Sequence, residues 1–224
     1  MPGTLRSCFV HECAWLFVCV TTAFSQTVPM AILPGTVSHD SASLVLDNAN
    51  ASISQTTRTY IIPLAIGNQW TMHIVEWDTD GNITSSRNET TQILGDTSIA
   101  GERWFIMKHR RGNTICINRP DGYYVLRSEV SSLQLKYPAN IGDSYEGPDG
   151  TMRVVSLNVN LSVPKGSFVC YQYETNLTRV GGLSVLNYYS PGVGFIGGQI
   201  VSANQNRTDA SISGKIELVD YILH

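Results

Sequence analysis

The chain has 224 residues, of which only 15% carry a charge, and its formal net charge is −3. Such a sparse and slightly negative charge offers no basic surface to phosphate groups, so we expect no nucleic-acid partner. No apolar run after the first 25 residues approaches the length of a transmembrane helix, so we expect no membrane span once those residues are removed.

The first 25 residues have the pattern of a secretory signal peptide. Arg6 supplies a positive charge near the start, and Cys13–Val20 form an apolar core that is too short to cross a bilayer. The small residues Ala23 and Ser25 predict cleavage before Gln26. The alternative is a membrane anchor that is never cut. Removal of 25 of the 224 residues would leave 199, which is enough for one domain with a sizeable core.

Residues 26–57 predict a flexible lead-in to the folded domain. They are rich in Ser, Thr, Ala and Asn, and they show no sustained hydrophobic period apart from one short strand expected at 42–46. From Arg58 onwards, short runs of β-branched and aromatic residues alternate with Gly, Asp, Asn and Pro, about every 8–14 residues. This spacing is typical of antiparallel all-β proteins, and we place a single β domain at residues 58–224.

The first clear strand of this domain is Gln69–Trp77. Its side chains alternate, so Trp70, Met72 and Ile74 should share one face of the sheet. The sequence Asp-Thr-Asp-Gly-Asn at 78–82 then predicts a hairpin turn, because these residues tolerate left-handed backbone.

Later segments repeat this pattern of apolar runs and turns, and none keeps a helical period for more than a turn or two. We expect further turns or loops at 95–97, 111–113, 119–122, 142–150 and 164–166. We expect further strands at 83–94, 104–109, 114–118, 123–130, 133–137, on both sides of 164–166, and at 183–189, 195–203 and 214–223. The predicted fold class is all-β: a strongly curved antiparallel sheet of about ten to twelve strands, open or partly closed and barrel-like, because one sheet of this size must curl.

Two cysteines, Cys116 and Cys170, remain after the leader is removed. Both lie in apolar strand runs, and an exported chain is in an environment where thiols oxidise, so we expect them to form a disulfide. The alternative is that both are buried thiols, since cysteine packs well as a small apolar residue.

Five short motifs are spread over the predicted domain: Pro-Leu-x-x-Gly-Asn-x-Trp at 63–70, Gly-Asp-Thr-x-Ile-x-Gly-x-x-Trp at 95–104, Asp-Gly-Tyr at 121–123, Val-Pro-x-Gly-x-Phe-x-Cys at 163–170 and Pro-Gly-Val-Gly at 191–194. With these motifs in matching order, the chain resembles a group of exported bacterial proteins that carry a single β-rich domain. The resemblance covers residues 60–223 and implies a curved antiparallel sheet in a secreted or periplasmic protein. It implies no reaction, because the group shares no activity.

No catalytic residue is predicted. Ser144, in Gly-Asp-Ser, lies between strands rather than on a turn from strand to helix, and Ser184 lacks the second glycine of a nucleophile elbow. No cofactor and no metal site are expected either. The best cation candidate is the trio Asp78, Asp80 and Asn82, which resembles the start of a calcium loop but has Ile83 where that loop needs Gly.

The aromatic residues suggest a binding function instead. Trp70, Tyr171, Tyr173 and Tyr188 could line the concave face of a curved sheet, where an apolar ligand or a protein partner would bind. The alternative is that they fill the core. We therefore predict an exported, non-catalytic β domain that binds a ligand or partner at the cell envelope or outside the cell. The other hypotheses are a structural or adhesion module that pairs through sheet edges and, last, a hydrolase.

Overall fold

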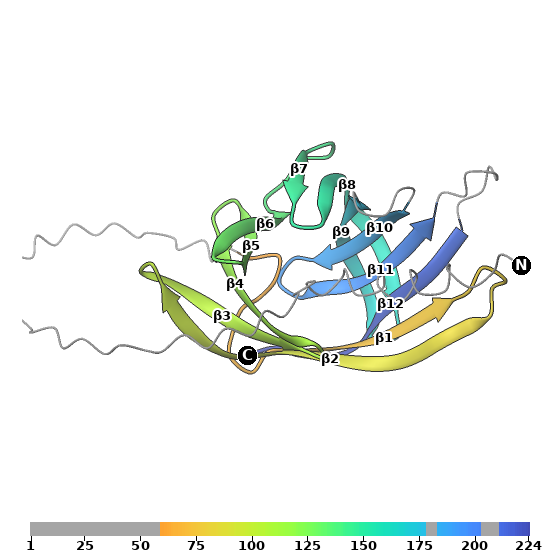
Figure 1. The fold of residues 1–224 in the computed structure, drawn as a ribbon, viewed down its shortest axis with the longest axis horizontal. Coiled ribbons are helices and arrows are strands. Elements are labelled where there is room, and N and C mark those ends of the chain that lie inside the picture. The colour runs from red at the N-terminus through yellow and green to blue at the C-terminus, as the bar shows by residue number, and fades with distance from the viewer. Residues whose placement is uncertain (1–58, 178–182, 203–210) are drawn as a thin grey trace, which may run out of the picture. The chain divides into compact units, whose positions relative to one another are not determined.

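The structure is a computed structural model that describes residues 59–177, 183–202 and 211–224 (Figure 1). These residues form one antiparallel sheet of twelve strands in the order β6-β5-β4-β3-β2-β1-β12-β11-β10-β9-β8-β7. The strands are β1 (Gln69–Trp77), β2 (Ile83–Ile99), β3 (Glu102–His109), β4 (Gly112–Arg119), β5 (Gly122–Arg127), β6 (Val130–Lys136), β7 (Ser144–Gly147), β8 (Gly150–Val163), β9 (Gly166–Leu177), β10 (Leu183–Ser190), β11 (Gly194–Ser202) and β12 (Ser211–Ile222). The described ranges hold no helix that is long and apolar enough to cross a membrane.

The prediction of an all-β, strongly curved antiparallel sheet is confirmed. The expected leader (1–25) and lead-in (26–57), with the short strand at 42–46, lie outside the described residues. Most neighbouring strands in the sheet are also neighbours in sequence, and the exception is the pairing of β1 with β12, which joins the two halves of the chain.

Strand β1 is central in the sheet, and it begins and ends at the predicted residues, Gln69 and Trp77. Trp70, Met72 and Ile74 are buried on one face, as the alternation predicts, and Glu76 follows them on the same face and is buried as well. The turn after β1 is closed by the Asp78 carboxylate, which accepts hydrogen bonds from the backbone of Asp80 and Asn82 at 2.9 and 2.8 Å. The short polar residues of this segment therefore form the hairpin that they predict.

Three local predictions were wrong. The strand expected at 123–130 is interrupted by a turn at Ser128 and Glu129, which both have positive φ, so that β5 ends at Arg127 and β6 begins at Val130. The segment 95–97 is not a turn: β2 continues to Ile99, with a register shift between Ile93 and Gly95, and the chain turns at Ala100 and Gly101, which both have positive φ. Glycine thus accommodates a bulge inside the strand rather than a reversal. The segment 142–150 is not a continuous loop, because Ser144–Gly147 form the short edge strand β7, paired with β8.

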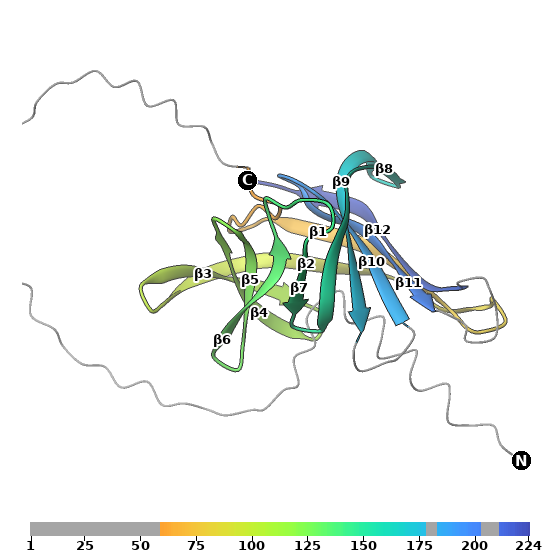
Figure 2. The same ribbon diagram turned by 90° about the horizontal axis from the view of Figure 1, so that it is seen from above.

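The sheet is nearly closed, because its two edge strands, β6 and β7, meet (Figure 2). The Tyr145 hydroxyl on β7 accepts a hydrogen bond from Lys136 N at 3.0 Å and donates to Gln134 O at 3.4 Å. The Tyr173 hydroxyl on β9 donates to Lys136 O at 2.8 Å. Lys136 also forms an ion pair with Asp143 at 3.0 Å. Side chains therefore take the place of a backbone ladder between the two edges.

The β8–β9 hairpin reaches across to β12. Lys165 N, in its turn, donates to Leu218 O at 3.1 Å, and the Lys165 ammonium pairs with Asp220. The Phe168 ring lies 6.3 Å from the Tyr221 ring, in an edge-on arrangement. This hairpin thus packs against the C-terminal strand of the folded domain.

The disulfide predicted between Cys116 and Cys170 is absent from the structure, in which both residues are buried thiols. Cys116 lies on β4 and Cys170 on β9, and six strands separate these two in the sheet order. Their sulfur atoms donate to the carbonyls of Phe105 and Phe168, at 3.6 and 3.7 Å. Burial raises the pKa of the Cys170 thiol to about 11, so this residue behaves as a small core side chain.

Candidate ligand-binding cavity

The inner face of the sheet encloses a cavity of about 90 Å³ that is partly open to solvent. Its walls come from strands in both halves of the chain and from the segment before β1. Eight of the lining residues are apolar or aromatic: Ile62, Trp70, Met72, Met107, Tyr123, Val125, Tyr189 and Phe195. Three are neutral polar residues: Thr91, His109 and Gln134. Predominantly apolar walls with a few polar groups are characteristic of small-molecule sites.

His109 is the one titratable base in the cavity wall. It ends β3, and its Nδ1 lies 3.2 Å from the Thr91 hydroxyl on the neighbouring strand β2. Burial lowers the pKa of His109 from 6.5 to about 4, because the charged imidazolium would lose its hydration. The imidazole is therefore neutral at pH 7.

Two polar atoms at this cavity lack a partner. His109 Nε2 and Gln134 Oε1 are both shielded from solvent, and neither has a hydrogen bond to any residue that the structure describes. Buried polar atoms in folded proteins nearly always have a partner, so each such exception needs an explanation.

A second, smaller cavity of about 20 Å³ lies next to the first, and Gln134 and Tyr189 line both. Its other walls include Thr175 and Asn187, which are buried polar residues. Asn187 Oδ1 is a further buried acceptor without a partner among the described residues. A space of this size is enough for one water molecule.

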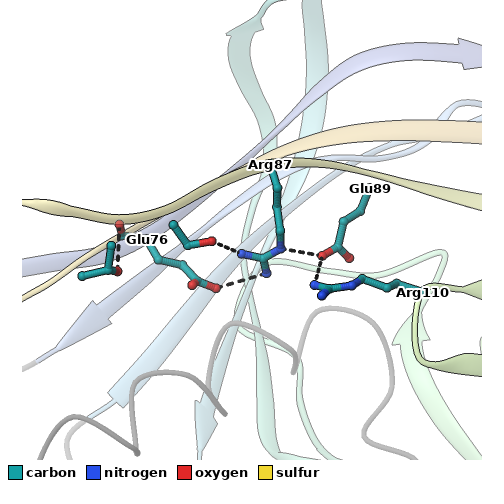
Figure 3. Close-up of polar contacts among 6 residues, drawn as sticks. Glu76, Arg87, Glu89 and Arg110 are labelled. Atoms are coloured by element: carbon teal, nitrogen blue, oxygen red, sulfur yellow. Dashed lines mark hydrogen bonds and ion pairs between the residues drawn. The ribbon is translucent and has the colours of Figure 1, made fainter.

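Beyond Thr91, the inner face becomes charged along β2, where Arg87 and Glu89 form a network with Glu76 and Arg110 (Figure 3). Arg87 Nε donates to Glu89 at 2.6 Å, and Arg87 Nη2 donates to Glu76 on β1 at 3.2 Å. Arg110 donates to the same Glu89 oxygen at 3.2 Å. Burial opposes the charge on Arg87, but the hydrogen bonds with the two glutamates outweigh it and raise its pKa. Two carboxylates face two guanidinium groups, so this network compensates its own charge.

Of the four aromatic residues predicted to bind a ligand, Trp70 lines the main cavity, and its indole N–H donates to Val193 O at 2.6 Å. Tyr173 is fully buried and closes the sheet through its hydroxyl. Tyr171 packs against Tyr137, with 5.4 Å between ring centres. Tyr188 lies in a shallow hollow beside Leu161 and Lys215, away from the main cavity. The structure thus brings only Trp70 of these four to the cavity.

The serine and cation candidates are placed on the surface. Ser144 is exposed at the start of β7, and the Ser184 hydroxyl donates to Asn176 on the neighbouring strand at 2.8 Å. His73 contacts the Ser86 hydroxyl at 3.0 Å, on the opposite face of β1 from the cavity. The Asp78 carboxylate is occupied by the turn that it closes. Within the described ranges, no group of three or more His, Cys, Asp or Glu residues is placed to hold a metal ion.

Sequence reasoning missed most of the cavity. Met107, Tyr123, Val125, His109 and Gln134 lie on β3, β5 and β6, whose inward faces were not predicted. The alternation in β1 was clear enough to place Trp70 and Met72 on one face. The partner strands are short and contain bulges, so a period of two could not identify their inward residues.

Comparison with known proteins gives a likeness in fold only. A candidate exported protein with a YmcC-like fold from Bacteroides fragilis aligns with 74% of this chain and 100% of its own, at 11% identity and a TM-score of 0.48. A candidate lipoprotein from Parabacteroides distasonis aligns with 73% of this chain and 99% of its own, at 14% identity and a TM-score of 0.42. No model of a known family and no curated protein matches this sequence. The function of this chain therefore has to be argued from its own residues.

Proposed function

We propose that this protein is an exported, non-catalytic β domain that binds a small apolar molecule on the inner face of its sheet. The observation that carries the proposal is the cavity, in which eight of eleven lining residues are apolar or aromatic and the three polar residues are uncharged. Removing apolar surface from water favours binding by roughly 25 cal/mol per Å². The volume of about 90 Å³ is smaller than the roughly 150 Å³ of an engineered cavity that binds benzene, but this cavity is partly open to solvent, so a single ring or a short stretch of hydrocarbon can enter it with part of its surface exposed.

Export rests on the N-terminal sequence. Residues 1–25 combine a short apolar core with small residues before Gln26, which is the pattern of a cleaved signal peptide. A secreted or periplasmic location follows from that cleavage. N-terminal sequencing of the secreted protein tests it, with Gln26 as the expected first residue.

Pairing through the sheet edges is less well supported. An adhesion module needs an edge strand with unpaired backbone groups. Here the C-terminal end of the edge strand β6 is covered, because Tyr145 and Tyr173 bind its backbone at Lys136. The hydrolase hypothesis is less well supported, because neither of its two candidate serines, Ser144 and Ser184, contacts a histidine within the described residues. The Ser86 hydroxyl does contact His73, but this pair is exposed on the face of β1 opposite the cavity.

Toluene binding tests the proposal. Saturation-transfer NMR on the purified chain should detect toluene bound to the wild-type protein. Val125→Phe, which fills the cavity from a position only 1% exposed, should weaken binding at least tenfold. Val130→Phe makes the same change on a residue that is 64% exposed and should leave binding unchanged. Absent binding, or equal binding by both variants, would contradict the proposal.

A further inference from the structure

The cavity carries unmet hydrogen-bonding capacity as well as apolar surface. His109 Nε2 and Gln134 Oε1 are buried in its wall without a partner among the described residues. Asn187 Oδ1 lies in the adjoining cavity, which shares Gln134 with the first, and it is unpartnered in the same sense. Two of these three atoms are amide oxygens, which only accept hydrogen bonds.

We propose that the occupant is an apolar molecule with one neutral hydrogen-bond donor, such as a hydroxyl group, placed against Gln134 Oε1 and His109 Nε2. This inference rests on the proposed function and specifies the class of ligand for the same cavity. A hydroxyl can donate to Gln134 Oε1 and accept from His109 Nε2 when His109 carries its proton on Nε2, and His109 Nδ1 then accepts a hydrogen bond from the Thr91 hydroxyl. Its apolar remainder would contact the walls formed by residues such as Trp70, Met107 and Val125.

A charged ligand group fits this cavity poorly. A carboxylate would face the Gln134 carbonyl oxygen. The inward-facing residue that precedes Thr91 on β2 is Glu89, whose negative charge would also repel a carboxylate. The cation nearest to that acid, Arg87, is engaged by Glu89 and Glu76. An ammonium group would have only neutral acceptors in the cavity wall. Burying either charge without an opposite charge is strongly unfavourable.

Three molecules of similar size separate these chemistries: toluene, benzyl alcohol and benzoate. In the wild-type protein at pH 7.5, benzoate should bind at least tenfold more weakly than benzyl alcohol. Gln134→Leu removes the acceptor, so it should weaken benzyl alcohol binding about tenfold, which is the usual loss for a buried hydroxyl without its partner, and leave toluene binding equal or stronger. Gln134→Met, which keeps the length of the side chain, should behave in the same way and guards against a folding defect. Gln92→Leu, on the other face of β2, is the matched control and should change neither affinity.

The outcomes distinguish the two proposals. Suppose that toluene binds but Gln134→Leu changes the affinities for toluene and benzyl alcohol equally, or changes neither. The inference about the donor is then overturned and the apolar site stands. A water molecule that already satisfies Gln134 would give this result. If benzoate binds as tightly as benzyl alcohol, the inference is also overturned. If toluene does not bind the wild-type protein, the proposed function itself fails.

Discussion

The half-buried histidine at the cavity, whose Nε2 is shielded from solvent, should make the stability of this protein fall in mildly acidic solution. His109 has a pKa of about 4 in the folded protein because it is buried, against 6.5 for an ordinary histidine. Between these values the unfolded chain binds a proton at this position that the folded chain does not bind. Proton binding at His109 therefore lowers the free energy of unfolding as the pH falls below 6.5, and this loss levels off near pH 4.

The magnitude follows from the two pKa values. Between pH 7.5 and pH 5, the difference in proton binding at His109 should remove about 2 kcal/mol from the free energy of unfolding. This is a large share of the roughly 5–15 kcal/mol by which a domain is usually stable. Other titrating groups change stability over the same interval, so the effect of His109 has to be isolated by a variant.

His109→Gln provides that comparison, because glutamine does not titrate and can still contact the Thr91 hydroxyl. Urea unfolding of both proteins at pH 7.5 and pH 5 measures the four free energies. The wild-type protein should lose about 2 kcal/mol more than the variant over this interval. Equal losses in both proteins would show that His109 is accessible to water in the folded state, which would refute the account of its burial.

Three further substitutions test the sheet. Tyr173→Phe removes the hydroxyl that binds a β6 carbonyl, so it should lower the free energy of unfolding in urea by about 1–2 kcal/mol, whereas Tyr171→Phe should have little effect. Gly122→Ala would place a methyl group 2.2 Å from a β6 carbonyl oxygen and should cost about 1–3 kcal/mol in the same assay, whereas Gly95→Ala, with nothing within 4 Å, should be tolerated. Asp78→Ala removes the carboxylate that closes the β1–β2 turn. Hydrogen bonds from that turn hold the pKa of this carboxyl below its usual value, so its stabilising effect is present at pH 7 and is partly lost at pH 3. The thermal midpoint should therefore fall more at pH 7 than at pH 3. Equal effects in each variant and its control, or at the two pH values, would contradict these assignments.

The sequence was sufficient to predict the fold class and the position of most strands. Turns rich in Gly, Asp and Pro are local features, so residues 78–82 and 119–122 could be identified without knowledge of the rest of the molecule. Gly95 was misassigned because a glycine in a bulge and a glycine in a turn look alike in sequence. The short strand β7 was missed because it is a strand through its pairing with β8, and the composition of its four residues does not predict that pairing.

The site was less predictable than the fold. Trp70 could be placed on the inner face because β1 alternates regularly. His109 and Gln134 lie on β3 and β6, with two strands between them, so they line one cavity only because the sheet curves. Curvature depends on bulges and on contacts far apart in sequence. The disulfide prediction failed for the same reason: compartment and cysteine number say nothing about which strands face each other.

The most direct test of the proposed cavity is to observe its own methionines while a ligand binds. Met72 and Met107 line the cavity, and Met152 lies in the smaller one beside it. In protein labelled with ¹³C at the methionine methyl groups, titration with toluene should shift the NMR signals of Met72 and Met107, because the ring of the ligand would lie against them. The signal of Met30, in the predicted lead-in, should not move. Unchanged Met72 and Met107 signals at toluene saturation, or shifts confined to Met30, would contradict a ligand site on the inner face of the sheet.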